Sequence, residues 1–582
     1  MKVTTCPLDC YDGCSIVVEE NLKLKGDKSH PVTQGFLCPH MNNYHKFKKI
    51  TTPLLYKKPI ELDEAIVKLA QKLKDTDPQK VLFYKGSGNL GVMQNVTKLF
   101  FSRYGAIIAQ GSLCDKAGGF GIEEGRGANL ALSPLHVAKS EVVILWGRNS
   151  SVSNSHMLPS LKGKRIIVID PVRTALAKKA DLHIAIEPKK DLYLALLLCK
   201  LIFDGGFEDR DFLKNRCENI GRFLALLERF SYEKISICSG VSIEQAKTLL
   251  SLLSGKKVSI LVGIGVQKYS FGHSVLRAID ALGAVLGLFG KDGCGVGYLS
   301  NSGYGFDKPF TPTCKNQKAQ YVAMSDFGSF DVVFIQGANP LSQTPCTPFV
   351  KDGLSRAGFV VYFGLDDNAT CKSADLVIPA KTFLEKNDVK LTYGHEFVGK
   401  MPKVFDSEFG ISEYDLCSKL NGFFGYEKMI DEELFISKVV DSNAIERDGY
   451  LISKSYIKNV YEDGFYTPSK KFHFIDSFED TQLDGDFYLL STKHIYSLNS
   501  QFKTDDYLYV PLSLGLKQDD EVVLSANGLT CRYAVKPSEN LRDDCVMMHS
   551  GAKNANHLTP RALSQKGCCA VYQEVKVMLK RA

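Results

Sequence analysis

The sequence predicts a multi-domain α/β chain that ends in a β-barrel, and three observations lead to this prediction. The chain has 582 residues, more than a single hydrophobic core usually serves. Apolar, β-branched runs that end in Gly, Asn, Asp or Pro alternate with helical stretches, which is typical of parallel sheets covered by helices. From about Asp484 onward, short alternating strands and turns follow without a long helix, which favours a closed barrel.

The α/β pattern begins after a cysteine-rich start. The stretch "TTPLLYKKPIELDEAIVKLAQKL" predicts a turn and an amphipathic helix, and "KVLFYKGSGNLG" predicts a buried strand that enters a glycine-rich loop. Similar strand-and-loop units recur at residues 140–154, 164–186, 257–267, 330–343 and 357–380.

Two consecutive stretches resemble two later ones. "VILWGRNSSVS" followed by "VIDPVRTALAKKADLHI" parallels "VFIQGANPLSQ" followed by "VYFGLDDNATCKSADLVI". Each copy carries Gly-x-Asn and then Asp at strand ends, which is where open α/β sheets bind nucleotides. We therefore predict two nucleotide-binding-like α/β domains.

The composition excludes several classes of protein. The 72 basic and 65 acidic residues give a net charge of only +7, and no block of Lys or Arg predicts nucleic acid as a partner. The longest apolar runs are shorter than the ~20 residues of a membrane-spanning helix. Few residues precede the first cysteine, so we expect no signal peptide. The odd number of cysteines, 17, suits a reducing compartment, and we expect a cytoplasmic protein.

Cysteines gather at the start of the chain. Cys6, Cys10 and Cys14 are spaced C-x3-C-x3-C, and Cys38 follows at a distance. A 4Fe-4S cluster takes four cysteine ligands, commonly three clustered and one distant. Structural zinc usually draws on paired cysteine knuckles, and unligated thiols are the other alternative. We predict that these four residues bind a 4Fe-4S cluster.

Taken together, these stretches resemble the molybdopterin oxidoreductase family, which includes dimethyl-sulfoxide reductase and formate dehydrogenase. The resemblance runs from Cys6 to about Val577. It implies a 4Fe-4S domain at 1–52, a discontinuous α/β domain at 53–138 and 320–483, an α/β dinucleotide-binding domain at 139–319, and a C-terminal molybdopterin dinucleotide-binding β-barrel at 484–582. The implied cofactors are a 4Fe-4S cluster and bis-molybdopterin guanine dinucleotide with Mo or W.

The resemblance also implies cofactor-binding residues in the first copy of the repeat. The matching positions are Gly147, Arg148, Asn149, Asp170, Pro171, Asp181 and Asp191. A carboxylate such as Asp191 can accept two N–H groups from a guanine edge, and Asp170 can bind ribose hydroxyls. Helix N-capping is the alternative role for these aspartates.

The second copy and the tail complete the implied site. The positions of the second copy are Gly337, Asn339, Asp366, Asn368, Thr370 and Asp375. Between the copies, Gly263 and Gly265 match the family's glycine-rich segment, although glycine also serves plain turns. In the tail, Ser500, Gln501 and Asn556 would hydrogen-bond the pterins, because amides pair with alternating donors and acceptors.

The stretch "AQGSLCDKAGGFG" places Cys114 at the position of the family's metal ligand. A soft thiolate suits Mo or W, and a buried loop thiol is the alternative. Formate dehydrogenases of this family have His directly after the ligand, whereas this chain has Asp115. Asp115 could act as a proton acceptor or donor, or could cap the helix that starts there.

A second departure follows the fourth cysteine. The family often has a basic residue there, between cluster and pterin, whereas this chain reads Cys38, Pro39, His40. His40 could bridge the two cofactors through a ring N–H, or could be an ordinary surface histidine.

The resemblance implies a molybdopterin-dependent oxidoreductase that performs two-electron chemistry on a small-molecule substrate at a Cys-ligated metal. Electrons would pass through the cluster to or from a partner such as a ferredoxin or an iron-sulfur subunit. Two alternatives stay open. One is a pterin-free, cluster-carrying scaffold subunit, and the other is a non-redox enzyme similar to the tungsten hydratases, in which Asp115 helps to add water.

Overall fold

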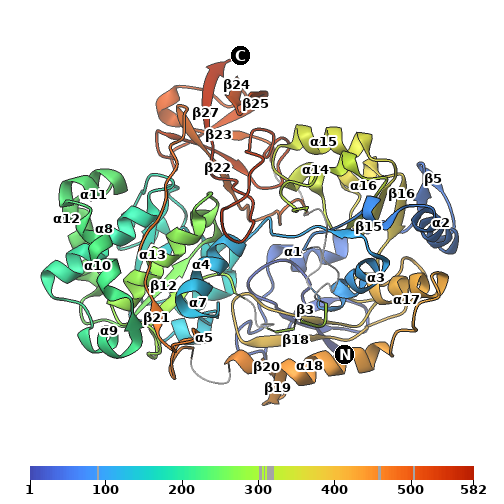
Figure 1. Cartoon of the computed structure of the whole chain (residues 1–582), viewed down its shortest axis with the longest axis horizontal. Coiled ribbons are helices and arrows are strands. Elements are labelled where there is room, and N and C mark those ends of the chain that lie inside the picture. The colour runs from blue at the N-terminus through green and yellow to red at the C-terminus, as the bar shows by residue number, and fades with distance from the viewer. Residues whose placement is uncertain (88–90, 301–304, 307, 311–319, 457–459, 503–504) are drawn as a thin grey trace. The chain divides into compact units, whose positions relative to one another are not determined.

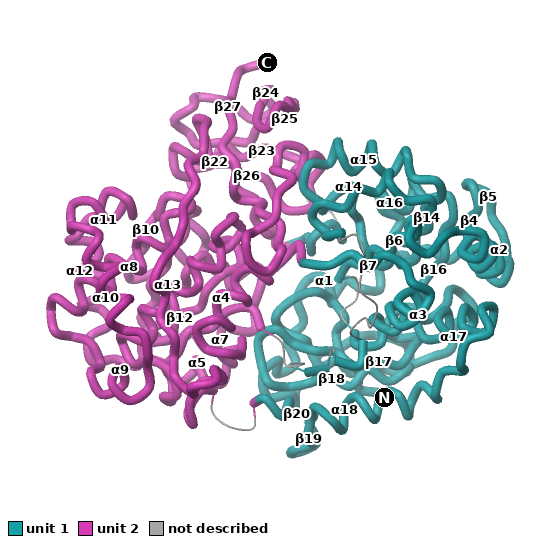
Figure 2. Tube along the Cα trace, in the orientation of Figure 1, with its two compact units in different colours: residues 1–111, 302–455, 496–503 teal, residues 112–301, 456–495, 504–582 magenta. Residues whose placement is uncertain are grey.

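The structure is a computed structural model that describes residues 1–87, 91–300, 305–306, 308–310, 320–456, 460–502 and 505–582. The chain forms two compact units (Figure 2). Unit 1 contains residues 1–111, 302–455 and 496–503, and unit 2 contains residues 112–301, 456–495 and 504–582. Residues 496–503 fall within the predicted barrel domain but belong to unit 1. The predicted division into four domains stays a prediction.

Unit 1 is built on a seven-stranded sheet of order β5-β4-β16-β15-β14-β6-β7. Figure 1 labels β5, β15 and β16 of this sheet. The strands from β16 to β7 are parallel, and β4 joins them antiparallel. Strands β14 and β15 are buried along their whole length, as their unbroken apolar runs predict. The bounds are β4 (Leu54–Leu55), β5 (Lys58–Pro59), β6 (Val81–Lys85), β7 (Ile107–Ile108), β14 (Val332–Gln336), β15 (Val360–Gly364) and β16 (Leu376–Pro379).

Helices and two smaller sheets complete unit 1. The predicted amphipathic helix is α2, which buries Ala65, Ile66 and Leu69 on one face. The first small sheet is antiparallel, β1 (Lys2–Thr5), β2 (Ser15–Val18) and β3 (Leu24–Gly26), and the second has the order β17-β18-β20-β19. The remaining bounds are α1 (Pro39–Asn42), α2 (Leu62–Lys74), α3 (Val96–Tyr104), α14 (Pro340–Gln343), α15 (Thr347–Arg356), α16 (Ala369–Ser373), β17 (Asp388–Lys390), β18 (Phe397–Met401), α17 (Glu413–Phe423), α18 (Glu432–Asn443), β19 (Ala444–Arg447) and β20 (Tyr450–Ser453).

Unit 2 holds a five-stranded parallel sheet of order β10-β9-β8-β12-β13. Helix α13 packs against α4 and α8, and nearly every residue of α13 is buried. The bounds are α4 (Lys116–Arg126), β8 (Val142–Trp146), α6 (Ser150–Ser153), β9 (Arg165–Ile169), β10 (Leu182–Ile184), α8 (Asp191–Gly205), α9 (Arg210–Arg216), α10 (Ile220–Glu228), α11 (Tyr232–Ser239), α12 (Ile243–Leu253), β12 (Val258–Val262), α13 (Gly272–Val285) and β13 (Gly295–Gly297).

Unit 2 also contains the closed barrel, of order β22-β26-β23-β25-β24-β27. Strands β24 and β25 form a hairpin across Asn527 and Gly528, which both have positive φ, the geometry that an Asn-Gly turn favours. The α/β fold class and the C-terminal barrel predicted from the sequence are therefore confirmed. The bounds are β22 (Phe487–Thr492), β23 (Leu508–Pro511), β24 (Glu521–Ala526), β25 (Leu529–Ser538), β26 (Cys545–His549) and β27 (Lys576–Arg581).

The two main sheets repeat one strand order. In unit 2 the order β10-β9-β8-β12 corresponds to β16-β15-β14-β6 in unit 1. Three of these four equivalences, β10 with β16, β9 with β15 and β8 with β14, are also visible in the internal sequence similarity. The fourth equivalence is between β12 and β6, and β6 lies far earlier in the chain than β14, β15 and β16. Among the described helices, none has the length and apolar character of a membrane span.

Candidate functional site

The first three cysteines of unit 1 lie in the connection between β1 and β2. Residues 5 and 15 pair at the end of this hairpin, and the Cys6 N–H donates to the Cys14 carbonyl at 2.8 Å. Cys38 comes directly before α1, and its carbonyl accepts from the Asn42 N–H. Cys6 and Cys14 are buried, whereas Cys10 and Cys38 are partly exposed. The hairpin thus brings the ends of the C-x3-C-x3-C motif together.

The four thiols lie close enough to affect one another. Burial raises the pKa of each, that of Cys10 to about 12, and electrostatic interactions join every pair among the four. In the described part of the chain, no group of three or more His, Cys, Asp or Glu side chains could hold a metal ion. A 4Fe-4S cluster needs a different arrangement, with four thiolates for four irons. The role of these four cysteines as cluster ligands therefore stays a prediction.

A segment from a distant part of the sequence packs against the cysteine hairpin. The Gly394 N–H donates to the Tyr11 carbonyl at 3.1 Å, and His395 Nε2 donates to the Asp12 carbonyl at 2.8 Å. A Cβ at Gly13, which has φ +48°, would lie 2.1 Å from Thr392 Cγ2. The fit between the two segments is therefore close.

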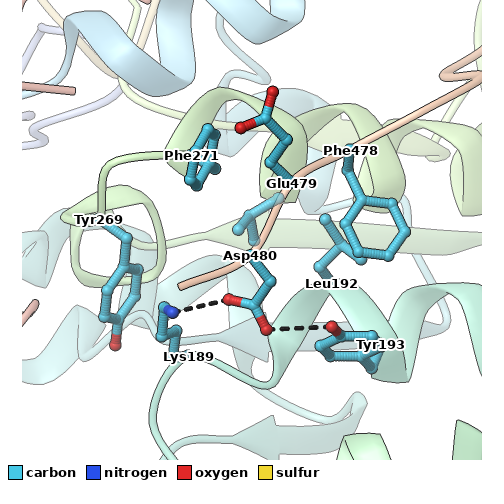
Figure 3. A pocket seen from close by; sticks show the side chains of 9 residues that line it. Lys189, Leu192, Tyr193, Tyr269, Phe271, Phe478, Glu479 and Asp480 are labelled. Atoms are coloured by element: carbon cyan, nitrogen blue, oxygen red, sulfur yellow. Dashed lines mark hydrogen bonds and ion pairs between the residues drawn. The ribbon is translucent and has the colours of Figure 1, made fainter. Parts of the chain in front are cut away.

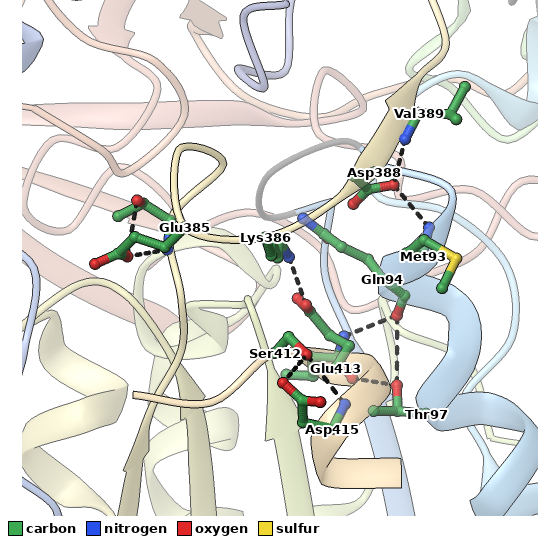
Figure 4. Close-up of polar contacts among 12 residues, drawn as sticks. Met93, Gln94, Thr97, Glu385, Lys386, Asp388, Val389, Ser412, Glu413 and Asp415 are labelled. Atoms are coloured by element: carbon green, nitrogen blue, oxygen red, sulfur yellow. Dashed lines mark hydrogen bonds and ion pairs between the residues drawn. The ribbon is translucent and has the colours of Figure 1, made fainter. Parts of the chain in front are cut away.

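The same segment begins in a buried polar cluster (Figure 4). Lys386 and Glu413 form a buried ion pair. Asp388 Oδ1 accepts from the N–H groups of Met93 at 2.9 Å and Val389 at 2.7 Å. These contacts fix the start of β17, whose last residue is Lys390. Burial lowers the pKa of Lys390, and the charges of Cys10 and Asp9 oppose this.

In unit 2, glycines follow the ends of the two central strands β8 and β12. Gly147 has φ +60°, and its N–H donates to the Ile169 carbonyl at 2.7 Å. Gly263 lies so close that a Cβ there would be 1.7 Å from the Gly147 carbonyl oxygen. Only glycine fits this approach, and the backbone stays open at the carboxyl ends of the strands, where dinucleotides bind.

Unit 1 repeats this arrangement. Gly337 has φ +52°, and its N–H donates to the Phe363 carbonyl at 2.9 Å. A Cβ at Gly86 would lie 2.7 Å from the Gly337 carbonyl oxygen, so Gly86 corresponds to Gly263. Sequence reasoning did not single out Gly86, although a glycine directly after the strand at 81–85 was a visible signal.

The two asparagines of the repeat also occupy matching places. Asn149 and Asn339 each precede a short helix, α6 and α14, and their carbonyls accept N–H groups from the first turn. Arg148, beside Asn149, is buried and donates from Nη2 to Asn154 Oδ1 at 2.6 Å. Gly265 lies in the turn that follows Gly263, and a Cβ added there would meet open space.

Asp170 and Asp191 lie near each other on unit 2, with Pro171 directly after Asp170. Asp170 follows β9 and accepts from the Val172 N–H at 2.8 Å. Asp191 begins α8, and its Oδ1 accepts from Trp146 Nε1 at 2.7 Å. Burial raises the pKa of Asp170 to about 7, with a further rise from Asp191, and burial raises that of Asp191 to about 6. One Asp191 oxygen is thus engaged by the protein.

We predict that Asp170→Asn stabilises the cofactor-free protein at pH 8 more than at pH 5. A carboxyl whose pKa rises on folding, here from 3.8 to about 7, favours the folded state at low pH and loses that contribution as pH rises through this interval. The benefit of the substitution should therefore grow by about 2.5 kcal/mol between the two pH values. Urea unfolding at pH 5 and pH 8 measures it.

The control for this prediction is Asp211→Asn, at an exposed aspartate of the same unit. Its effect on the free energy of unfolding should differ by less than about 0.5 kcal/mol between the two pH values. An Asp170→Asn effect that is equal at both pH values would contradict the prediction.

Asp181 and Asp375 each bind a backbone N–H of a neighbouring strand. Asp181 Oδ2 accepts from the Ile166 N–H at 2.8 Å, and Asp375 Oδ2 accepts from the Val360 N–H at 2.8 Å. Each precedes its strand, β10 or β16, and therefore lies at the amino end of the parallel strands. Nucleotides bind at the opposite edge, so these two residues are separate from the glycine-lined strand ends.

In unit 1, a polar network joins the repeat to residues 496–503. Asn339 Nδ2 donates to Ser500 Oγ at 3.1 Å, and Thr370 Oγ1 donates to Asn339 Oδ1 at 2.9 Å. Gln501 Nε2 donates to Asp366 Oδ2 at 3.2 Å, and burial raises the pKa of Asp366. Residues predicted from two separate motifs therefore meet at the carboxyl ends of β14 and β15.

Cys114 lies in a loop of unit 2 that side chains hold in place. Its N–H donates to Ser112 Oγ at 2.8 Å, and its carbonyl accepts from Gln267 Nε2 at 2.8 Å. Gln267 is fully buried, and its Oε1 accepts from the Gly118 N–H at 2.9 Å. The loop backbone is thus fixed, while the partly exposed thiol is not in a disulfide.

Asp115 comes directly before α4, but its side chain does not cap that helix. Ser112 Oγ donates to Asp115 Oδ1 at 3.3 Å, and Tyr298 donates to the Asp115 carbonyl at 3.3 Å. Burial raises the pKa of Asp115, and Lys116 and Lys268 oppose this. The geometry therefore does not support the helix-capping alternative.

Two further predicted site residues, His40 and Asn556, lie in different units. His40 lies on α1, and its ring stacks on Phe502 with centroids 4.6 Å apart. Asn556, in unit 2, is buried, and its carbonyl accepts from Thr559 Oγ1 at 3.0 Å. The roles that the sequence suggested for both side chains stay predictions.

A pocket opens in unit 2 next to the start of α8 (Figure 3). Aromatic side chains line it, among them Tyr193, Tyr269 and Phe478. Lys189 Nζ donates to Asp480 Oδ1 at 2.6 Å, and the Tyr193 hydroxyl donates to Asp480 Oδ2 at 3.0 Å. Lys189, Tyr193 and Asp480 thus bond to one another in the wall of the pocket.

Comparison with known proteins agrees with this geometry. Residues 58–410 match the model of the family "Molybdopterin oxidoreductase". The probable oxidoreductase YyaE of Bacillus subtilis is 26% identical, covering 81% of this chain and 78% of its own. The F420-dependent formate dehydrogenase 2 subunit alpha of Methanococcus maripaludis is 28% identical, covering 51% and 47%. The fold is similar to that of acetylene hydratase from Pelobacter acetylenicus, with a TM-score of 0.77, 15% identity and 100% coverage of both chains.

Proposed function

The chain belongs to the molybdopterin oxidoreductase family, and from this premise we propose that it performs two-electron chemistry on a small-molecule substrate. The proposed cofactors are bis-molybdopterin guanine dinucleotide with Mo or W, and a 4Fe-4S cluster. When bound, the metal and its pterins would supply the two-electron chemistry, and the protein supplies ligation, orientation and electrostatics.

The observation that carries the cluster proposal is the set of four mutually interacting thiols. They come from a hairpin and from the start of α1, and no disulfide joins them. Burial raises their pKa values, so four free thiolates would be costly in this place without a positively charged partner. Iron supplies that charge. The proposed ligands are Cys6, Cys10, Cys14 and Cys38.

The strand ends support the pterin proposal. In unit 2, Gly147 and Gly263 leave room for a phosphate-bearing ligand against the backbone, and Asp170 offers a carboxylate to ribose hydroxyls. In unit 1, Gly337 is the equivalent glycine. The amides of Asn339 and Gln501 offer donors and acceptors to a pterin.

The loop at Cys114 supports the metal proposal. Gln267 and Ser112 hold the backbone on both sides of the thiol, which orients a ligand without using its sulfur. Cys114 would bind Mo or W through its thiolate. We further propose an electron partner such as a ferredoxin or an iron-sulfur subunit, and a cytoplasmic location.

Metal and pterin analysis of anaerobically purified protein tests the proposal. After expression with molybdate or tungstate, we expect about four irons and about one Mo or W per chain, together with pterin fluorescence in the denatured protein. A screen of electron donors and acceptors should then identify a redox reaction. Protein without Mo, W and pterin but with the full iron content would instead favour the cluster-carrying scaffold.

A second candidate is a non-redox hydratase. The similarity of the whole fold to acetylene hydratase and the uncapped carboxyl of Asp115 beside Cys114 favour it. In such an enzyme Asp115 would hold or move a proton during the addition of water. Turnover that proceeds without any electron donor or acceptor would select this candidate over the redox reaction.

A further inference from the structure

Lys390 is a buried lysine whose ammonium group lacks a counter-ion of the usual kind. The side chain is 0% exposed, and within the described part of the chain its Nζ has no hydrogen-bond partner. Nζ lies 5.5 Å from the centre of the Tyr393 ring. Such a burial costs roughly several kcal/mol unless a negative charge lies nearby.

The strand register explains where this charge lies. Lys390 is the last residue of β17 and pairs with Gly399 of β18. A Cβ at Gly399 would be only 2.4 Å from the side chain of Thr5, which precedes Cys6. Lys390 interacts electrostatically with Cys10, Cys6 and Cys14, and with Asp9. The groups that interact with Lys390 and can carry a negative charge, the Asp9 carboxylate and the thiols once they are ligated, therefore lie mainly on the cysteine hairpin.

The neighbouring lysine Lys386 is a useful contrast. It is also buried, but Glu413 neutralises it in a direct ion pair. Lys49 is similarly paired with Glu385 at 2.6 Å. Lys390 has no such carboxylate in the described residues, so its charge is left to act on the cysteine site.

We propose that Lys390 supplies the fixed positive charge that sets the reduction potential of the 4Fe-4S cluster, an inference that rests on the proposed function. Reduction adds one electron, so the reduced cluster carries one more negative charge than the oxidised one. A nearby ammonium stabilises the reduced form more than the oxidised form. Net charge and hydrogen bonds are known determinants of cluster potentials.

The test is an EPR-monitored redox titration of the holoprotein and its variants with dithionite as the reductant. Lys390→Met should make reduction at least tenfold less favourable, a potential lower by 59 mV or more for one electron. Lys390→Arg keeps the positive charge, so its reduction potential should differ from that of the wild type by less than about 59 mV. Lys46→Met, at an exposed lysine of unit 1, is the control and should not change the potential.

Iron and sulfide content separates the possible outcomes. A wild-type protein without a cluster would disprove the proposed function, whereas a cluster whose potential is the same in Lys390→Met would overturn this inference alone. If Lys390→Met loses the cluster, Lys390→Gln is the second neutral variant. Loss of the cluster in both neutral variants but not in Lys390→Arg supports the role of the charge. Loss of the cluster in all three variants overturns the inference, because the shape of the lysine side chain and not its charge would then be required.

Discussion

Cys114→Ala is expected to lower turnover by more than about 100-fold while the iron content per chain stays unchanged. Removing a group that merely orients a metal ligand typically costs 10–100-fold, so losing the ligand itself should cost more. The cysteines proposed for the cluster belong to unit 1 and Cys114 to unit 2, so the substitution leaves the cluster ligands intact. Steady-state kinetics and metal analysis measure the two effects.

Cys568→Ala is the matched control. Cys568 is partly exposed, and its carbonyl accepts from the Ser112 N–H at 3.3 Å in the same loop region. Its thiol has no proposed role, so Cys568→Ala should retain activity within a fewfold range of the wild type. Wild-type turnover in Cys114→Ala would show that the thiol does not bind the metal.

The repeat was predictable because its signals are local. A glycine that must take a positive φ directly after a buried strand, as at Gly147 and Gly337, is visible in a single stretch of sequence. The sequence motif did not reveal at which end of the parallel strands each aspartate lies. Asp181 and Asp375 belong to the repeated motif that matches the family's cofactor-binding positions. Each residue comes directly before its strand and therefore lies at the amino end of that strand, where its carboxylate accepts a backbone N–H.

Contacts between distant segments could not be predicted in the same way. The side chain of Lys390 acquires its surroundings only when β18 packs beside β1, and no spacing rule connects residue 390 with residue 6. The sequence of β17 mixes polar and apolar residues in no pattern that indicates a site. Similarly, Ser500 and Gln501 were predicted within the barrel domain, yet they belong to unit 1, because the chain leaves the barrel between β22 and β23.

Arg126→Met is expected to lower the free energy of unfolding of the protein by about 3–5 kcal/mol, because it leaves Asp280 buried without its partner. Arg126 ends α4, the helix that starts after Cys114. Its Nε donates to Asp280 Oδ2 at 2.7 Å, Nη2 contacts the other oxygen, and Nη1 donates to the Val296 carbonyl at 2.9 Å. Both side chains are 0% exposed. Urea unfolding followed by fluorescence measures the loss.

The pH dependence and a double variant separate charge from packing in this prediction. Burial raises the pKa of Asp280, and Arg126 opposes that rise. Without Arg126 the folded-state pKa should rise further, so the deficit should be smaller at pH 5 than at pH 8, where an ionised Asp280 would be stranded. Arg126→Met combined with Asp280→Leu removes both charges and should recover most of the lost free energy, because apolar replacement of a buried pair is often neutral.

The exposed pair of Arg532 and Glu521 is the control for the same measurement. Its side chains are 71% and 61% exposed, so Arg532→Met should cost less than about 1 kcal/mol. An Arg126→Met cost as small as this would mean that water reaches Asp280 in the variant. A double variant no more stable than Arg126→Met would mean that the arginine acts through its packing on Phe289, 4.6 Å from the guanidinium. Only a deficit that is large, dependent on pH and relieved by Asp280→Leu fits a buried charge pair that anchors the helix carrying the Cys114 loop.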